Sequence, residues 1–343
     1  MRRPSLVLYR AVRAAAQFCI AAKAVGKENN MFRYITKRIL SMIPVLLGIS
    51  IVVFLAVRLI PGDYATIALG TQYTEEAAVL LREKYGLDQP ILYQYLVWMK
   101  GILTGDFGYS YTSGQPVLTL LLARLPVTLE LASLSLLMAV LVGIPMGYWA
   151  ACKRNKLPDS LVTVTGLLGI SIPNFWLGTM MVLLFSLKWK LVPSGGFVPL
   201  SEGIAENLRC MILPVIALGM AVSAVVMRSS RSAMIEVTDQ EYMKMAKAKG
   251  LSGISLILKH GVKNTMVNVL TIIGLQMGSL LGGSVVIEQI FSLPGIGSLA
   301  LQAINNRDYL VLQGTVLFTA VMFVTINLIV DLLYCVVNPQ IRY

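Results

Sequence analysis

Long apolar segments separated by shorter polar ones form the main pattern along this chain of 343 residues. Six apolar segments approach or exceed the roughly 20 residues that a helix needs to cross a bilayer. They lie near residues 39–60, 127–151, 161–187, 211–227, 267–290 and 314–337. Lipid offers the backbone no hydrogen-bond partners, and the alternating pattern of a membrane barrel is absent, so the pattern predicts helices. The expected fold is an all-α integral membrane protein with six transmembrane helices.

The polar segments divide this fold into parts. We expect the first transmembrane helix at 31–60, an external insert at 61–126, and a membrane domain at 127–337 with a cytoplasmic loop at 228–264. A short cytoplasmic tail follows at 338–343. The insert is rich in aromatic residues and predicts two helices, a capped one between Thr74 and Gly86 and another after Pro90 that lies along the membrane face. The insert either packs on the other helices as a lid or docks an external partner.

The first 30 residues differ from the rest. They have a basic start and a short apolar stretch that loosely resembles a signal peptide, but Arg10, Arg13 and Lys23 interrupt it. A second start-like sequence, "MFRYITKRIL", begins at Met31. Residues 1–30 are therefore expected to be an N-terminal extension outside the fold, with a functional amphipathic helix as the alternative.

Composition and charge agree with a membrane protein and give its orientation. Hydrophobic residues make up 56% of the chain and charged residues 13%, against about 25% charged residues in soluble domains. The mean hydropathy is +0.73. Lysines and arginines concentrate before the first span, after the second and after the fourth, which predicts cytoplasmic termini. The net charge of +12 is therefore a topology signal, and no basic patch with interleaved aromatic residues suggests nucleic-acid binding.

Residues that bind metals or form disulfides are scarce. The four cysteines are scattered singly, and only Cys210 falls near the predicted outer face. His260 is the only histidine. The sequence therefore predicts no metal site, no cofactor and no external intrachain disulfide.

The segment "EYMKMAKAKGLSG" (241–253) is unusually charged for this chain. Tyr242, Met245, Ala246 and Lys249 follow helical spacing, and Gly250 is placed to end the helix in the left-handed conformation. A second short helix begins after it. A helix–Gly–helix that projects into the cytoplasm is suited to docking in a groove of a partner protein.

This segment resembles the cytoplasmic coupling loop of importer-type ABC permeases. Ala246 matches the second alanine of that family's E-A-A pattern and Gly250 matches its glycine, whereas Lys244 and Met245 replace the first two residues. Downstream, His260, Val262 and Lys263 replace the family's Ile, Leu and Pro, departures that are typical of the permeases for dipeptides, oligopeptides and nickel. Further segments in the right order are similar to the same subfamily: "KYGLDQPILYQY", "GDFGYS", "RLPVTLEL", "EQIFSLPGIG", "RDYLVLQG" and "NLIVDLLYCVVNPQIR". The resemblance runs from Met31 to Arg342.

The resemblance implies a paired-permease importer. The expected partners are a second homologous permease, two cytoplasmic ATP-binding subunits and an external substrate-binding protein. The sequence has no phosphate-binding G-x-x-x-x-G-K-[ST] loop, so the chain itself is not expected to be an enzyme. The ATPase-coupling residues are then Glu241, Tyr242, Met245, Ala246, Gly250 and Leu251. Peptides are the expected cargo, and "RLPVTLEL", "LPDSLV" and "SIPNFWLG" keep nickel or a metal chelate open as the alternative.

A few polar and small residues inside the spans are candidates for the translocation path: Pro173, Asn174, Gln276, Ser279 and Gly283. Pro173 is expected to kink the third span, either for packing or to line a water-filled path. Gly274, Gly278 and Gly282 have the spacing that lets helices approach closely. An acid within an apolar run is costly and is a candidate for function, but for Asp331, Glu130 and Glu288 we expect anchoring or a helix-to-helix bond, since all three lie toward the ends of spans.

Two other classes remain as alternatives. An ion-coupled secondary transporter would carry buried charges near the middle of the membrane, where only Asp331 comes close. A membrane scaffold without transport would not need the segment around Gly250.

Overall fold

The computed structural model describes residues 28–59, 69, 73–84, 86–251 and 253–337, and within these ranges it contains helices and no strand. Most of the predicted extension 1–30 and all of the predicted tail 338–343 lie outside the described residues. Five helices are long and apolar enough to cross a membrane, and a sixth span is possible as a bent pair of helices. The prediction of an all-α protein with six spans is confirmed.

The six spans lie where the apolar segments predicted them. The continuous ones belong to helices α2 (Glu28–Arg58), α6 (Val117–Cys152), α9 (Ile204–Thr238), α12 (Lys263–Ile290) and α14 (Tyr309–Val337). The bent one consists of α7 (Leu157–Ser171) and α8 (Asn174–Met181), which continues as the π-helical segment η2 (Val182–Lys188). The shorter helices are α4 (Glu75–Lys84), α5 (Ile91–Thr104), α10 (Glu241–Ala248), α11 (Gly253–Leu256), the π-helical segment η3 (Ile257–Val262) and α13 (Ile296–Asn305).

Helices α6 and α9 extend beyond the apolar segments that predicted them. Helix α6 begins at Val117, ten residues before the expected start, and includes Pro126. Helix α9 continues to Thr238, into the segment expected to be a loop from residue 228. At 1.5 Å per residue such helices are roughly 50 Å long, longer than the hydrocarbon core of a bilayer. Packing explains the extra turns, because Val117 and Leu121 are fully buried against Leu299 and Val311.

The third span is broken, not merely kinked. The two halves meet at an angle of 93° on either side of Ile172 and Pro173. Pro173 lies in extended backbone at the start of α8, where its missing N–H costs no helical hydrogen bond. The expected effect of Pro173 on the helix is confirmed, and it is stronger than a packing kink.

Helices α6 and α9 form the centre of the molecule and pack along most of their lengths. Gly147 of α6 lies directly against the α9 backbone, where a Cβ atom would collide with the carbonyl oxygen of Met227. Glu130 of α6 accepts a hydrogen bond of 2.7 Å from Asn207 of α9. The expected helix-to-helix role of Glu130 is therefore confirmed.

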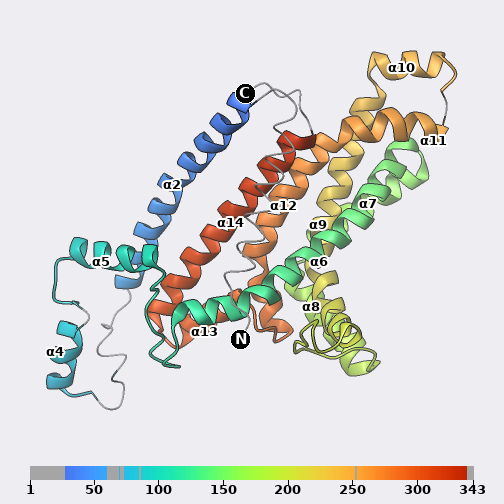
Figure 1. Ribbon diagram of the computed structural model, residues 1–343. Helices are drawn as coiled ribbons and strands as arrows, with labels where there is room; N and C mark the ends of the chain where they lie inside the picture. The colour runs from blue at the N-terminus through green and yellow to red at the C-terminus, as the bar shows by residue number, and fades with distance from the viewer. Residues whose placement is uncertain (1–27, 60–68, 70–72, 85, 252, 338–343) are drawn as a thin grey trace.

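Helix α2 lies at the edge of the bundle beside α14 (Figure 1). Most of its span faces away from the protein, since only 11% is buried. Arg38 of α2 forms an ion pair of 2.5 Å with Asp331 of α14. Asp331 therefore has the anchoring role that its position in the sequence predicted.

We expect Arg38→Glu to loosen α2 from α14, because two carboxylates would then face each other at the end of an otherwise weakly buried helix. The melting temperature of the purified complex should fall by a few degrees, which corresponds to about 1 kcal/mol for a partly exposed pair. Combining Arg38→Glu with Asp331→Arg should recover most of that loss. A double variant that melts no higher than Arg38→Glu alone would contradict the anchoring role.

The insert between the first two spans folds against the end of α2. Helix α4 is capped as expected, with the Thr74 hydroxyl accepting the Ala77 N–H at 3.3 Å. Helix α5 crosses the end of α2 (Figure 1), where Tyr95 and Trp98 surround the buried ring of Phe54 with centroids 5.2 and 5.6 Å away. The two helices predicted in the insert are therefore confirmed.

The last part of the insert is attached to the loop between α13 and α14. Ser110 and Thr112 donate hydrogen bonds to the buried carboxylate of Asp308, at 2.7 and 3.0 Å. The Tyr111 hydroxyl donates to the carbonyl of Asn306 at 3.0 Å. Burial, together with the Asp308 carboxylate, raises the pKa of Tyr111 above its usual range, so the phenol keeps its proton even in alkaline solution. The insert therefore contacts both α2, the first described helix, and the loop that leads into α14, the last one.

The short helices form two groups that lie at opposite ends of the molecule (Figure 1). Helices α10 and α11 project at one end, and α4, α5 and α13 lie at the other. Segments that were expected to face opposite sides of a membrane are therefore on opposite ends of the bundle.

Candidate functional site

Helix α10 is a short amphipathic helix held on the bundle by few contacts. It packs on α9 and α11. Its one buried residue is Met243, which is 2% exposed. Tyr242 and Met245 are 41% and 61% exposed, and Glu241 is exposed as well. The large apolar side chains predicted to dock a partner are therefore accessible in this chain.

Gly250 ends α10 as the sequence predicted. Its φ angle is +87°, in the left-handed region. The Gly250 N–H bonds to the carbonyl of Lys247, and the Leu251 N–H reaches back to the carbonyl of Ala246 at 3.2 Å. This pair of bonds is the Schellman arrangement that closes helix ends through a glycine. The segment 241–251 is thus a single helix with a fixed end, and Leu251 leads on toward α11.

Two contacts of α10 were not anticipated from the sequence. Met243 anchors the helix from the side opposite to Tyr242 and Met245. Asn264, at the start of α12, donates its side-chain N–H to the Tyr242 hydroxyl at 3.0 Å and to the His260 carbonyl at 2.8 Å. The position of α10 is therefore linked to α12 as well as to α9.

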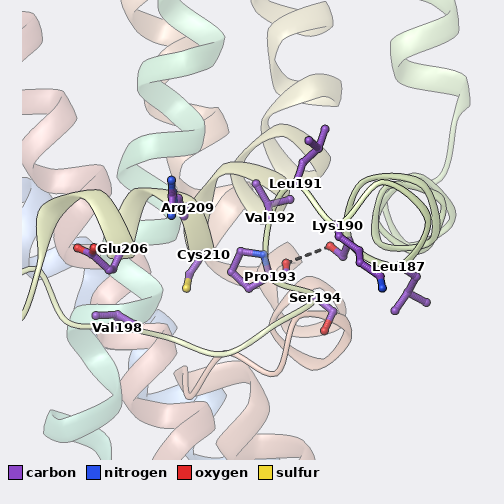
Figure 2. A pocket seen from close by; sticks show the side chains of 11 residues that line it. Leu187, Lys190, Leu191, Val192, Pro193, Ser194, Val198, Glu206, Arg209 and Cys210 are labelled. Atoms are coloured by element: carbon purple, nitrogen blue, oxygen red, sulfur yellow. Dashed lines mark hydrogen bonds between the residues drawn. The ribbon is translucent and has the colours of Figure 1, made fainter.

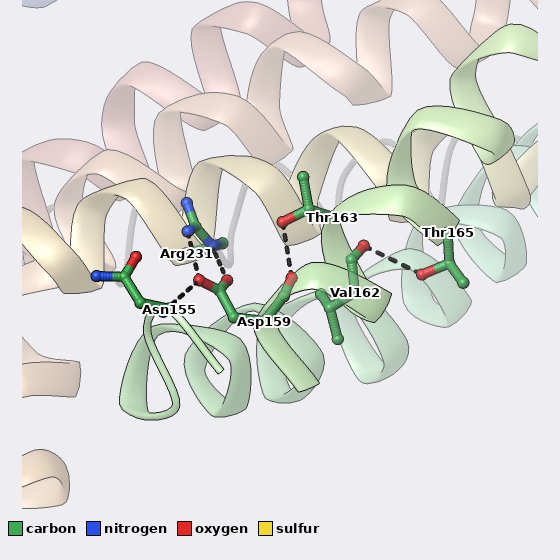
Figure 3. Close-up of polar contacts among 6 residues, drawn as sticks. All are labelled: Asn155, Asp159, Val162, Thr163, Thr165 and Arg231. Carbon is green, nitrogen blue, oxygen red and sulfur yellow. Dashed lines mark hydrogen bonds and ion pairs between the residues drawn. The ribbon is translucent and has the colours of Figure 1, made fainter. Parts of the chain in front are cut away.

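A second polar cluster joins the start of α7 to α9 (Figure 3), and the start of α7 lies at the end of the bundle that carries α10 (Figure 1). Both carboxylate oxygens of Asp159 accept from the Arg231 guanidinium, at 2.5 and 2.9 Å. The Asn155 N–H also donates to Asp159 at 3.0 Å, from a turn in which Asn155 has φ +62°. Asp159 is 7% exposed and Arg231 is 27% exposed. In the sequence, Arg231 was one of the basic residues that indicate the cytoplasmic side. Its pairing with Asp159 was not predicted, because the two residues are 72 positions apart and meet only when α7 packs on α9.

The expected path residues lie on two elements. Pro173 is exposed and Asn174 half-buried at the break between α7 and α8. Gln276 is half-buried, and Ser279 and Gly283 are exposed, at successive turns of α12. The side chains of Asn174, Gln276 and Ser279 make no hydrogen bond within the described part of the chain. Helices α8 and α12 touch through Gly178, where a Cβ atom would lie 3.5 Å from Ile287 of α12. No described contact joins Asn174 to the polar strip of α12.

The glycines of α12 explain how that helix meets α14. A Cβ atom at Gly274 would collide with Val330, and one at Gly278 with Phe323. Close packing is therefore confirmed for these two glycines. Gly282 has open space around it, so the third glycine of the series does not belong to that contact.

The far end of α12 is fixed by a buried carboxylate. Glu288 is fully buried, and it accepts hydrogen bonds from Thr128, from Ser284 and from the backbone N–H of Ser298, each at 2.9 Å. Thr128 belongs to α6 and Ser298 to α13, so Glu288 joins three helices. This confirms its predicted bonding role. Within the described ranges no group of three His, Cys, Asp or Glu side chains is arranged to hold a metal ion.

Comparison with known proteins places the chain in a family. Residues 143–343 match the family described as the binding-protein-dependent transport system inner membrane component, and residues 31–132 match the N-terminal domain of such components. The chain belongs to this family. It is a multi-pass inner-membrane permease subunit of an ABC importer, and ATP hydrolysis is carried by partner subunits. An ATP-binding protein and a substrate-binding protein are its partners.

Several curated relatives of this permease are similar over their whole length. The glutathione transport system permease protein GsiC of Salmonella typhimurium is 41% identical over 313 residues, which are 91% of this chain and 100% of the relative. The protein of the same name in Escherichia coli strain K12 is 40% identical over the same coverage.

A solved structure supports the permease fold independently. The match is to a structure titled as an inward-facing conformation of the MetNI methionine ABC transporter, with a TM-score of 0.53 and 15% sequence identity. It covers 64% of this chain and 96% of the other chain. At this identity the likeness shows the fold of the permease and not its cargo.

Proposed function

We propose that this permease forms one half of the translocation path of a peptide importer, beside a second homologous permease. Two ATP-binding subunits would dock on the α10 end, and a substrate-binding protein would deliver cargo at the end that carries α4 and α5. In this arrangement both termini are cytoplasmic, 61–126 is external, and 228–264 is the coupling loop of a domain spanning 127–337. The identity of 40–41% with glutathione permeases supports peptides as cargo, because glutathione is a tripeptide.

The exposed face of α10 is the observation that carries the coupling role. Tyr242 and Met245 are accessible, while Met243 and the Gly250 end fix the helix in place. A rigid, amphipathic helix laid in a partner's groove transmits a rigid-body displacement to the helices that hold it. Glu241, Ala246 and Leu251 would complete the contact surface.

The strip along α12 supports the path. Gln276, Ser279 and Gly283 place polar and small groups on a helix that contacts α9 and α14 on its other sides. Unpaired polar groups on a membrane helix are stable where they face water or a second protein. Pro173 and Asn174 would contribute at the break beside α8.

Uptake assays in a strain that lacks this gene test the cargo. We expect loss of uptake of labelled glutathione or a small dipeptide, unchanged uptake of radiolabelled nickel, and recovery when the gene is restored. Depleting ATP in the restored strain should abolish peptide uptake again. Loss of nickel uptake alone would overturn the peptide proposal and identify a metal-chelate permease.

A further inference from the structure

A pocket of about 530 Å³ lies where η2, the loop after it and the first turns of α9 meet (Figure 2). One wall is apolar and consists of side chains such as Leu187, Leu191 and Val192. Two basic side chains, Lys190 and Arg209, come from different walls. Cys210 also lines the pocket and is half-buried.

The two cations in this pocket have no partner within the described part of the protein. Neither Lys190 nor Arg209 forms an ion pair or a side-chain hydrogen bond there. The pocket's one carboxylate, that of Glu206, lies instead against Gly203 at the start of its own helix. The charged side chains of the lining, Lys190, Arg209 and Glu206, therefore leave the pocket with a net charge of +1.

The charge is also unexpected for the side of the membrane on which it lies. Lys188, Lys190 and Arg209 flank the loop between the third and fourth spans, which is external in the proposed orientation. Lysine and arginine otherwise concentrate on the cytoplasmic side of membrane proteins. Topology thus gives no reason for Lys190 and Arg209, the two of these residues that line the pocket, and a ligand of opposite charge would.

The surroundings identify the kind of ligand. Leu187 is 58% exposed within the last turn of a membrane span, and Leu191 is 65% exposed three residues beyond the end of that span, so both are accessible to lipid. Trp189 is 52% exposed and packs edge-on against Phe185 with centroids 5.1 Å apart. Exposed tryptophan marks the level of lipid headgroups. An apolar wall toward the lipid tails and cations at headgroup level together fit an anionic amphiphile.

We propose that this pocket binds an anionic phospholipid of the outer leaflet, with its phosphate between Lys190 and Arg209 and its acyl chains along Leu187 and Leu191. Guanidinium and ammonium groups are the usual protein partners of phosphate oxygens. A bound lipid would brace the bent third span against α9. The proposal rests on the orientation given under the proposed function and not on the cargo.

The natural thiol in the pocket reports whether the site is filled. The purified transporter complex is placed in nanodiscs of zwitterionic lipid, with or without one fifth phosphatidylglycerol, and alkylation of Cys210 is followed by peptide mass spectrometry. Anionic lipid should slow alkylation of Cys210. It should leave Cys152, an exposed thiol at the other end of the bundle, unchanged as an internal control.

Charge variants test whether Lys190 and Arg209 cause the protection of Cys210 by anionic lipid. Lys190→Gln with Arg209→Gln should weaken the protection on the order of tenfold or more, since each cation contributes to anionic-lipid attraction. The matched control, Lys188→Gln with Lys100→Gln, removes two exposed cations outside the pocket. This double variant should keep the protection of Cys210 by anionic lipid. Equal protection in both double variants would overturn the proposal, because protection would then be a general membrane effect.

Two further outcomes would assign the pocket to another ligand. Protection by millimolar inorganic phosphate in purely zwitterionic nanodiscs would make it a site for free anions. Protection only when a substrate-binding protein is added would make it a protein contact. Orientation is tested separately, since a membrane-impermeant maleimide added to sealed spheroplasts should reach Cys210 from outside.

Discussion

Gly250→Val is expected to lower peptide uptake at least about tenfold while the protein still inserts in the membrane. The native φ of +87° lies in the left-handed region, which costs ordinary L residues about 1–2 kcal/mol and β-branched residues more. Valine would therefore open the two backbone bonds to Ala246 and Lys247 that close α10. Because no atom lies within 4 Å of a Cβ at this position, the effect would come from the backbone and not from a clash.

The matched control is Gly250→Asn, because asparagine tolerates the left-handed conformation far better than valine. We expect the asparagine variant to keep most of its uptake. In the assembled complex, Gly250→Val should continue to hydrolyse ATP with little transport, so the ratio of cargo moved to ATP consumed is the decisive measurement. Normal uptake by Gly250→Val would count strongly against the docking role of α10.

Asp159→Asn is expected to destabilise the end of the bundle that carries α10. Removing one member of a buried ion pair costs about 3–5 kcal/mol, and the lower end applies here because Arg231 is 27% exposed. A loss of that size corresponds to a fall of roughly 5–10 °C in the melting temperature of the purified complex. The loss arises because Arg231 keeps its charge without a bidentate partner, and the one oxygen left in the asparagine amide cannot replace both carboxylate oxygens for Arg231 and the Asn155 N–H.

The chain offers a matched pair for comparison at the same end. Arg154 and Asp239 also join the α6–α7 turn to the end of α9, at 3.0 Å, but they are 51% and 65% exposed. Asp239→Asn removes the same charge and should cost at most about 1 kcal/mol, because water screens an exposed pair. Equal shifts in melting temperature for Asp159→Asn and Asp239→Asn would refute the structural role assigned to the buried pair.

The sequence predicted the features that depend on local chemistry. Apolar segments of membrane length identified the six spans, because lipid forces each span to satisfy its own backbone. Gly250 was identified as a helix end because the left-handed conformation there favours glycine. Asp331, Glu130 and Glu288 were identified as bonding residues, since a carboxylate beside a membrane span is rarely left without a partner.

Other features required the tertiary structure. Whether a proline kinks or breaks a span depends on what holds its two halves, and the 93° break at Pro173 is not encoded in the proline alone. The burial of Met243 and the exposure of Met245 depend on which side of α10 meets α9. Helices α6 and α9 extend beyond their apolar segments because residues distant in the sequence bury the extra turns. Leu299 and Val311 cover the start of α6, and Ile257 and Val262 pack on Met234 near the end of α9.

The sequence by itself thus determined the class of the protein, its six spans and the helix that ends at Gly250, because each follows from the local fit of residues to lipid or to a backbone conformation. Only the tertiary structure decided which residues meet. Asp159 pairs with Arg231, 72 residues away, and Glu288 joins α6 to α13. Lys190 and Arg209 line one pocket, and neither forms an ion pair among the residues that the structure describes. Such pairings depend on helix packing, which sets distances between segments that the order of residues leaves open.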